Sequence, residues 1–327
     1  MKKLIRKLND IFKIGHCFGF KYALYEFFIE IAFKKIIFIK KYFIIKRNNS
    51  VKKYLYKKYN YVFNDYHNIN TLPNKIESDS KVFVFWWQGF DNCPEIVSSC
   101  LKSIKKHLGN HELIMLSAEN FSDYVKFPDY ILEKLENKTI SLTHFSDLLR
   151  VSLLEKYGGI WLDATIFINR EYDNQIYNYS FYTVKHGLYA DYHICRGKWT
   201  TSVFMSSKNS FFMSYIKHFL LEYWKNENFP ITYLFLDCII SLGYDYIDEI
   251  KNIIDAVPMN NTDIFKIEKY YTLPYEKEKF DIDNSQTYLY KMNYKRKLIK
   301  EQDGHLTFYG EILRRCASTN KNKKKTI

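Results

Sequence analysis

Short apolar runs alternate with longer amphipathic segments between residues 82 and 168. Val82 to Trp87 is a β-branched and aromatic run followed by Gln88-Gly89, which predicts a buried strand that ends in a loop. Residues 94–107 carry apolar side chains at helical spacing, and residues 112–117 form a second buried run. A strand, a helix and a strand in this order predict a βαβ unit and therefore a parallel sheet.

The strongest helical pattern lies in residues 144–157, and Gly158-Gly159 ends it. The next three residues, Ile160-Trp161-Leu162, predict a third buried strand that ends at Asp163, and residues 165–168 are expected to resume it. Weaker patterns predict helices at residues 128–136, 211–225 and 231–242 and an extended segment at 286–294.

The first 60 residues interleave apolar and basic positions and predict two or three helices, followed by a polar connector at residues 61–80. They hold 16 Lys and Arg but only three Asp and Glu, which accounts for the whole net charge of +13. A basic amphipathic end beside a neutral body favours docking on an anionic membrane surface. The alternatives are an ordinary helical subdomain and a nucleic-acid-binding region. We expect no nucleic-acid partner, because no recognised nucleic-acid motif accompanies these residues.

Composition places the chain among globular proteins. It has 327 residues, of which 47% are hydrophobic and 26% are charged, and this balance excludes a wholly disordered or fibrous chain. The longest uninterrupted apolar run has six residues, whereas a membrane-spanning helix needs about 20. The first apolar stretch is short and interrupted by charges, unlike a secretory signal. We therefore expect a cytoplasmic protein that lies peripherally at the inner face of the cell membrane.

Two predicted strand ends carry residues suited to ligand binding, which in open α/β sheets occurs at the carboxyl ends of strands. At the first, Trp86 or Trp87 can stack on a nucleotide base, although two tryptophans in a strand are also common core residues. Gln88 and Gly89 follow them in the predicted loop. At the second, Asp163 can hold ribose hydroxyls or a cation, but a turn or capping role explains a lone aspartate equally well.

The helix at residues 144–157 offers a further charged pair. Asp147 and Arg150 lie three residues apart, so they lie on the same face of the helix and can form a local ion pair. They can also bind sugar hydroxyls through charged hydrogen bonds. Spacing alone leaves both interpretations open.

The combination of these motifs is more specific than any one of them. Residues 146–165 (SDLLRVSLLEKYGGIWLDAT), with VFWWQG about 60 residues earlier, resemble the bacterial capsular polysaccharide synthesis glycosyltransferases. These are relatives of the DxD-containing glycosyltransferase family 32. Softer similarity continues through EYWK and YLFLD to TYLYKMNYK and GHLTFY, so that it covers about residues 80–315.

The resemblance implies an α/β fold of the GT-A-like nucleotide-diphospho-sugar transferase type, a Rossmann-like mixed sheet flanked by helices. Residues 76–327 would form this domain, and residues 1–75 would form the basic helical extension and connector. The implied activity is transfer of a sugar from a nucleoside-diphosphate sugar, with UDP favoured, to a growing surface glycan or polyprenyl-linked glycan, with retention of configuration. The alternative is a catalytically inactive relative that acts as a scaffold in a polysaccharide assembly complex.

The resemblance also nominates site residues. Asp163, Asp147 and Arg150 would be catalytic. The donor would be bound by these three and by Trp86, Trp87, Gln88, Gly89, Gly159, Thr165, Lys291 and Lys295. The two lysines would neutralise the diphosphate, unless they are simply solvated. Thr165 stands where the DxD motif has its last aspartate, so Mn²⁺ or Mg²⁺ binding by Asp163 and Thr165 is left open, with His305 or Asp237 as a substitute ligand.

Overall fold

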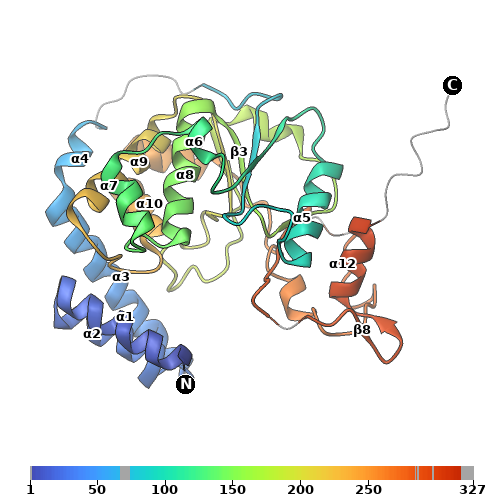
Figure 1. The fold of residues 1–327 in the computed structure, drawn as a ribbon, viewed down its shortest axis with the longest axis horizontal. Coiled ribbons are helices and arrows are strands. Elements are labelled where there is room, and N and C mark those ends of the chain that lie inside the picture. Colours follow the sequence, from blue (N-terminus) through green and yellow to red (C-terminus); the bar gives the residue numbers. More distant parts are fainter. Residues whose placement is uncertain (1, 67–73, 284, 286, 297, 318–327) are drawn as a thin grey trace.

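A five-stranded mixed sheet forms the centre of the computed structural model, which describes residues 2–66, 74–283, 285, 287–296 and 298–317. The strand order is β2-β1-β3-β6-β5 (Figure 1). The strands are β1 (Val82–Phe85), β2 (Leu113–Leu116), β3 (Gly159–Asp163), β5 (Phe181–Thr183) and β6 (Val203–Ser206). The first three run parallel, whereas β6 and β5 run antiparallel to their neighbours. The predicted α/β class with a mixed sheet flanked by helices is therefore confirmed.

Helices cover both faces of this sheet. In Figure 1, helix α8 lies on one side of β3 and α5 on the other. Four helices lie between β1 and β3 in the sequence: α5 (Glu95–Lys106), α6 (Phe121–Tyr124), α7 (Asp129–Glu136) and α8 (Leu142–Tyr157). The later helices are α9 (Phe211–Asn226), α10 (Phe235–Tyr246), α11 (Asp248–Ala256) and α12 (Phe308–Ala317). Their apolar faces and the sheet form one continuous core.

Two small antiparallel sheets lie beside the main one. Strand β4 (Ile166–Ile168) pairs with β7 (Leu289–Lys291), and β8 (Glu301–Gln302) pairs with β9 (His305–Leu306). The β4–β7 register places Lys291 opposite Ile166, three residues after Asp163. This pairing brings the C-terminal part of the chain to the carboxyl end of β3.

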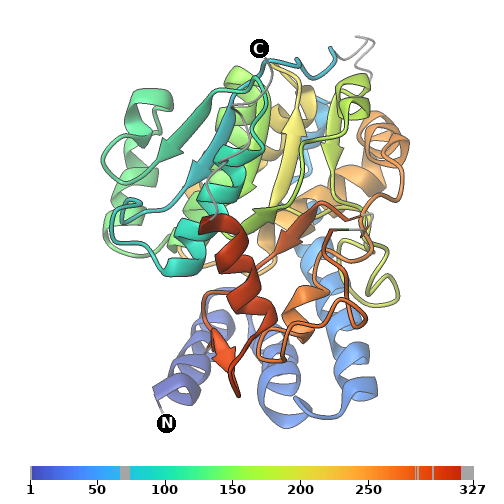
Figure 2. The same ribbon diagram turned by 90° about the vertical axis from the view of Figure 1, so that its right-hand side faces the viewer.

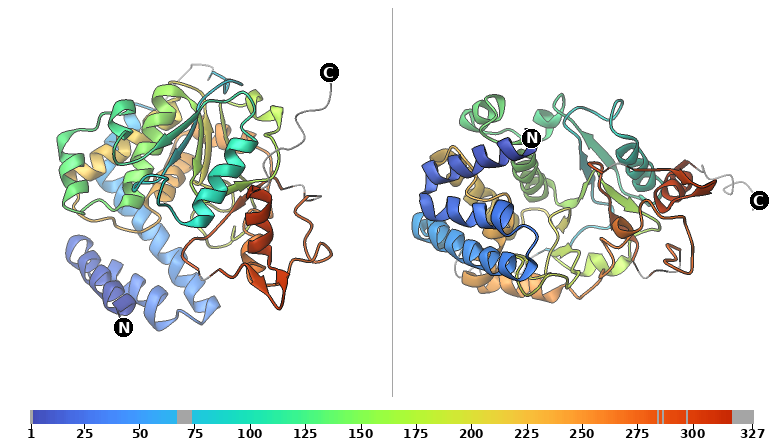
Figure 3. Two further views of the ribbon diagram at one scale, coloured as in Figure 1. Left: turned by 45° about the vertical axis from the view of Figure 1, so that its right-hand side comes forward. Right: turned by 90° about the horizontal axis from the view of Figure 1, so that it is seen from below.

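The N-terminal region folds as helices that pack on the α/β body. They are α1 (Lys2–Phe18), α2 (Phe20–Phe27), the π-helix η1 (Phe28–Ala32), α3 (Ile37–Tyr59) and α4 (Tyr61–Asn64). Seen from below in Figure 3, α1, α2 and α3 lie side by side along one edge of the molecule. No described helix is long and apolar enough to cross a membrane.

A buried carboxylate joins these helices to the body. Glu227, at the end of α9, accepts hydrogen bonds from Tyr54 Oη at 2.7 Å and Tyr59 Oη at 3.2 Å, and it pairs with Lys58. All three partners lie on α3. A charged hydrogen bond is stronger than a neutral one, so this contact holds α3 firmly against α9.

Most predicted elements match the structure to within a few residues, and two predictions are wrong. The strand predicted at residues 82–87 is β1, which ends two residues earlier, at Phe85, and Gly89 N donates to Trp86 O in the turn that follows. Residues 166–168 do not resume β3 but form β4 in a separate sheet. The predicted connector at residues 61–80 begins with helix α4, and its residues 67–73 lie outside the described part.

Candidate active site

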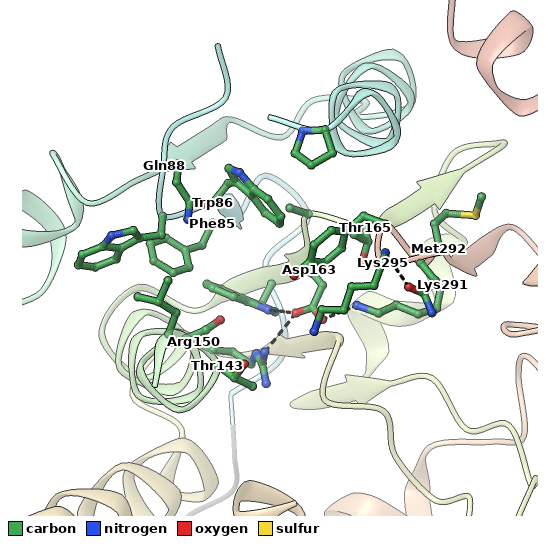
Figure 4. Close-up of a pocket in the computed structure, with 18 of the residues that line it drawn as sticks. Phe85, Trp86, Gln88, Thr143, Arg150, Asp163, Thr165, Lys291, Met292 and Lys295 are labelled. Atoms are coloured by element: carbon green, nitrogen blue, oxygen red, sulfur yellow. Dashed lines mark hydrogen bonds and ion pairs between the residues drawn. The ribbon is translucent and has the colours of Figure 1, made fainter. Parts of the chain in front are cut away.

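The carboxylate of Asp163 lies at the carboxyl end of β3, the last position of a buried strand. Arg150 Nη2 and Trp161 Nε1 donate to its Oδ1 atom, at 3.1 Å and 3.0 Å. Lys291 Nζ donates to its Oδ2 atom at 2.5 Å. Figure 4 shows these three interactions converging on one side chain. Both oxygens of Asp163 are therefore engaged, and two of the three donors carry positive charge.

These partners determine the charge of Asp163. Burial raises the pKa of its carboxyl group, but the nearby charges of Lys291 and Arg150 outweigh burial and lower the pKa to about 2. Its side chain is still 26% exposed. Asp163 is thus a deprotonated, accept-only group that can be reached from solvent.

Arg150 links Asp163 to a second carboxylate. Its Nη1 atom donates to Asp147 Oδ1 at 2.9 Å, one turn earlier on α8. The guanidinium also faces the ring of Trp161, with 5.1 Å between its carbon and the ring centroid. Its buried Nε atom has no hydrogen-bond partner among the described residues. Arg150 is therefore held from two sides and keeps one donor unused.

Asp147 lies behind this arginine and is ionised less readily than Asp163. Burial raises the pKa of its carboxyl group to about 7; Arg150 opposes this shift, while the charges of Asp237 and Asp163 add to it. Asp237, on α10, accepts from Trp199 Nε1 at 2.8 Å, and burial raises its pKa as well. Two buried acids of raised pKa thus lie on the inner side of Arg150.

A pocket of about 650 Å³ opens at this edge of the sheet. It brings together most of the residues that the sequence nominated. Those that line it are Trp86, Trp87, Gln88, Arg150, Asp163, Thr165, Lys291 and Lys295. Figure 4 shows Phe85, Trp86 and Gln88 on one side of the pocket, and Lys291 and Lys295 next to Asp163 on the other. An aromatic wall facing a cationic one suits a ligand with a flat ring and negative charge.

The two tryptophans have different surroundings. Trp87 packs edge-on against Phe145, at 5.7 Å between ring centroids, and stacks on Phe121 at 6.1 Å. Trp86 meets one described aromatic ring, that of Tyr294, edge-on at 5.2 Å. Trp87 is therefore held in an aromatic cluster, whereas a face of Trp86 can be offered to the pocket.

Five nominated residues do not line the pocket, and Asp237 is one of them. Gly89 has φ +78° with open space where a Cβ would stand, so it serves the turn after β1. Gly159 lies at the opposite end of β3 from Asp163, where a Cβ would come within 2.3 Å of Lys81 O. Asp147 is covered by Arg150, and His305 is exposed on β9.

Several lining residues were not nominated from the sequence. Tyr233, Glu268, Asn293 and Tyr294 all contribute to the pocket wall. Asn293 Nδ2 donates to Glu268 Oε1 at 3.1 Å, which fixes the segment that carries both lysines. Asn293 and Tyr294 stand between Lys291 and Lys295 in the sequence. Their position between two nominated lysines could have identified them as pocket residues.

The residues present do not form a good divalent-cation site. Thr165 adds no charge, and both oxygens of Asp163 already accept from other groups. Within the described ranges, no group of three or more His, Cys, Asp or Glu side chains could hold a metal ion. Asp237 is bonded to Trp199 and does not line the pocket. The ammonium of Lys291 stands where positive charge beside Asp163 would be needed, so we derive no step through a metal.

Parts of the chain are similar to known proteins. A 113-residue segment is 33% identical to "O-glycosyltransferase braB" of Annulohypoxylon truncatum, and it covers 32% of this chain and 27% of that protein. The chain thus matches about a quarter of that relative's length. The solved structure "PaToxG Glycosyltransferase" aligns over 71% of this chain and 92% of its own, with 15% identity and a TM-score of 0.38.

A family model gives the broadest match. The model described as "Capsular polysaccharide synthesis protein" matches residues 32–312, which include α3, the whole mixed sheet and both pocket lysines. The match covers far more than half of the chain. The chain therefore belongs to the capsular polysaccharide synthesis protein family.

Proposed function

We propose that this protein is a glycosyltransferase that moves a sugar from a nucleoside-diphosphate sugar to a hydroxyl group of a surface glycan, capsular or related. Family membership and the similarity to an O-glycosyltransferase support glycosyl transfer in general. One observation carries the assignment to the pocket. Asp163 is held between Arg150 and Lys291 at the carboxyl ends of β3 and β1, the edge at which open α/β sheets bind ligands.

In this proposal the nucleotide base stacks on Trp86. Support comes from the packing: Trp87 is committed to Phe121 and Phe145, whereas Trp86 lines the pocket with one described aromatic neighbour. A base stacked on an aromatic side chain gains about 1–3 kcal/mol. Gln88, in the same turn, can contact the edge of the base.

The diphosphate is held by the cationic wall. Lys291 and Lys295 line the pocket beside Arg150, and their charges would stabilise the negative charge that develops as the sugar leaves the diphosphate. Lys291 is already positioned by Asp163, so it loses little freedom when the donor binds. The lysines thus supply the charge that a cation supplies in DxD enzymes.

Hydroxyl groups of the donor are proposed to form hydrogen bonds with Asp163 and Arg150. Asp163 can only accept, because its pKa is lowered to about 2, and Arg150 can only donate. Asp147 acts through Arg150 as a positioning residue. The family resemblance suggests retention of configuration, with departure and attack on the same face of the sugar. We assign no residue as a covalent nucleophile.

The direct test is a nucleotide-release assay on the purified full chain. A panel of UDP-, GDP- and CMP-sugars is supplied with and without a glycan acceptor, and Asp163→Ala is the control. We expect one donor to be turned over, with UDP-sugars favoured, and turnover to be lost in the control. Equal release by wild type and Asp163→Ala would contradict the assignment of the pocket.

A scaffold role without catalysis is the alternative, and one residue favours it. Thr165 replaces the charged end of a DxD motif, as expected of a relative that has lost its chemistry. A scaffold would bind no donor in the pocket. Absence of both turnover and nucleotide binding would therefore favour this second function.

A further inference from the structure

The N-terminal helices expose large apolar side chains that have no cover in the described structure. On α1 they form one stripe, Leu4, Ile5, Leu8 and Phe12, the last of which is 76% exposed. The adjoining side of the same helix carries Ile14, which is buried. The apolar surface of α1 is thus wider than the side that packs on the protein, and the stripe faces solvent.

A second exposed group lies where α3 begins. Ile36, Ile37 and Phe38 follow the turn after the π-helix, and Phe38 is the most exposed of them at 84%. Tyr42 and Ile45 continue from Phe38 at helical spacing and are exposed as well. We call this group together with the α1 stripe the N-terminal apolar surface.

Unpaired positive charge surrounds these side chains. Lys34, Lys35 and Lys46 are exposed, and none of them pairs with a carboxylate in the described part of the chain. Two of the nearby acids are already neutralised, because Glu30 pairs with Lys7 and Glu26 pairs with Arg47. Asp10 is exposed on α1 and is outnumbered by the three lysines. The surface is therefore both apolar and net positive.

We infer that the N-terminal apolar surface docks on an anionic lipid bilayer. Aromatic and aliphatic side chains next to lysines are suited to the boundary between headgroups and acyl chains, where the ring is buried and the ammonium meets a phosphate. A second copy of this chain is a poorer partner, because two such surfaces carry the same charge. The mixed sheet and its core do not take part in the contact.

The position of the N-terminal helices would also help the proposed sugar transfer. The docking itself does not depend on that transfer. In Figure 2 the N-terminal helices, in blue, and the C-terminal segment that carries β8 and α12, in red, lie below the sheet. The C-terminal segment also supplies the pocket lysines. A docked protein would therefore hold its site near a membrane-bound acceptor, such as a polyprenyl-linked glycan.

The test is co-sedimentation of the full chain with vesicles, which needs no donor or acceptor. Vesicles of phosphatidylcholine alone are compared with vesicles that also contain phosphatidylglycerol. We expect preferential binding to the anionic vesicles, weakened by added salt because salt screens the attraction. Equal binding to the two kinds of vesicle, or to neither, would overturn the inference.

Matched variants locate the surface. Two double variants remove exposed apolar side chains only: Ile37→Ser with Phe38→Ser, and Leu8→Ser with Phe12→Ser. We expect at least one of them to lower partitioning into anionic vesicles by about 10-fold or more. Lys34→Gln with Lys35→Gln should lower it about 5-fold per lysine. Met259→Ser, 58% exposed and outside this surface, is the control.

Three outcomes of the variant experiments would also overturn the inference. Both apolar double variants could bind vesicles as wild type does, or the Met259→Ser control could lose as much binding as they do. The variants could also change the oligomeric state while vesicle binding stays intact. The last would assign the surface to a second copy of the chain. Thermal melting of each variant checks that it folds. Because nucleotide release is measured separately, failure of the docking and failure of the proposed transfer can be told apart.

Discussion

The Nζ atom of Lys291 lies 2.5 Å from Oδ2 of Asp163, although 128 residues separate them in the sequence. The β4–β7 pairing produces this contact, since β4 begins three residues after Asp163 and β7 ends at Lys291. The ion pair gives the pocket a fixed ammonium beside its carboxylate.

Lys291→Met should lower the rate of donor turnover by about 100-fold or more, because it removes a positioned charge next to the leaving diphosphate. Release of nucleotide from the accepted donor measures it. Lys269→Met is the matched control, since Lys269 is an exposed lysine of the same C-terminal segment that does not line the pocket. Equal rates for the two variants would remove Lys291 from the mechanism.

Chelation should leave turnover unchanged. Lys291, Lys295 and Arg150 supply positive charge in the pocket, and Thr165 adds none of the negative charge that a tightly bound cation requires. The measurement is nucleotide release after dialysis against EDTA, with and without added Mn²⁺ or Mg²⁺. Activity that disappears with EDTA and returns with Mn²⁺ would show that a metal, and not the lysines, neutralises the diphosphate.

The two tryptophans should respond differently to truncation. Trp86→Ala should weaken binding of the nucleotide by about 10-fold or more and leave the free energy of unfolding nearly unchanged. Trp87→Ala should destabilise the fold by about 3 kcal/mol, because it leaves a cavity beside Phe121 and Phe145. Equilibrium binding and urea unfolding measure the two effects, and the reverse pattern would assign the base to Trp87.

The pH dependence of stability should reveal the protonated state of Asp147. Its pKa is raised to about 7, against about 4 in the unfolded chain, so between these values the folded protein holds a proton that the unfolded chain releases. The free energy of unfolding should therefore fall as pH rises through this window, by up to about 4 kcal/mol. Urea unfolding of wild type and Asp147→Asn isolates this contribution.

Asp163 provides the comparison of opposite sign. Its pKa is lowered to about 2, so its stabilising contribution is present above about pH 4 and is lost as pH falls toward 2. Relative to Asp163→Asn, wild type should lose stability only in that acid range. If the free energies of unfolding of wild type and Asp147→Asn differ by the same amount at every pH between 4 and 8, the raised pKa of Asp147 is contradicted.

Local sequence patterns predicted the parallel half of the sheet well. The runs that form β1, β2 and β3 are short, buried and bounded by turns, so their hydrophobicity alone identifies them. Strands β5 and β6 were missed. They pair antiparallel, so neither belongs to the strand–helix–strand pattern that identified the parallel strands.

The candidate site was predictable in part for the same reason. Strand ends are local features, so Trp86 and Asp163 could be found from their neighbours in the sequence. The contact between Lys291 and Asp163 depends on pairing between β4 and β7, which no local pattern specifies. Glu268 enters the pocket from the short 3-10 helix η3 (Ile267–Lys269), and Tyr233 enters it from the turn before α10. Their positions in the pocket follow from the tertiary fold alone.

In the proposed function, this pocket binds a nucleoside diphosphate through Trp86 and Lys291. Titration calorimetry of UDP and GDP into the full chain, in EDTA, measures this binding, with Trp86→Ala and Lys291→Met beside wild type. We predict that wild type binds at least one of the two nucleotides, and that each variant binds it about 10-fold or more weakly. Absence of binding to wild type with or without Mn²⁺, or equal affinity in all three proteins, would contradict the claim.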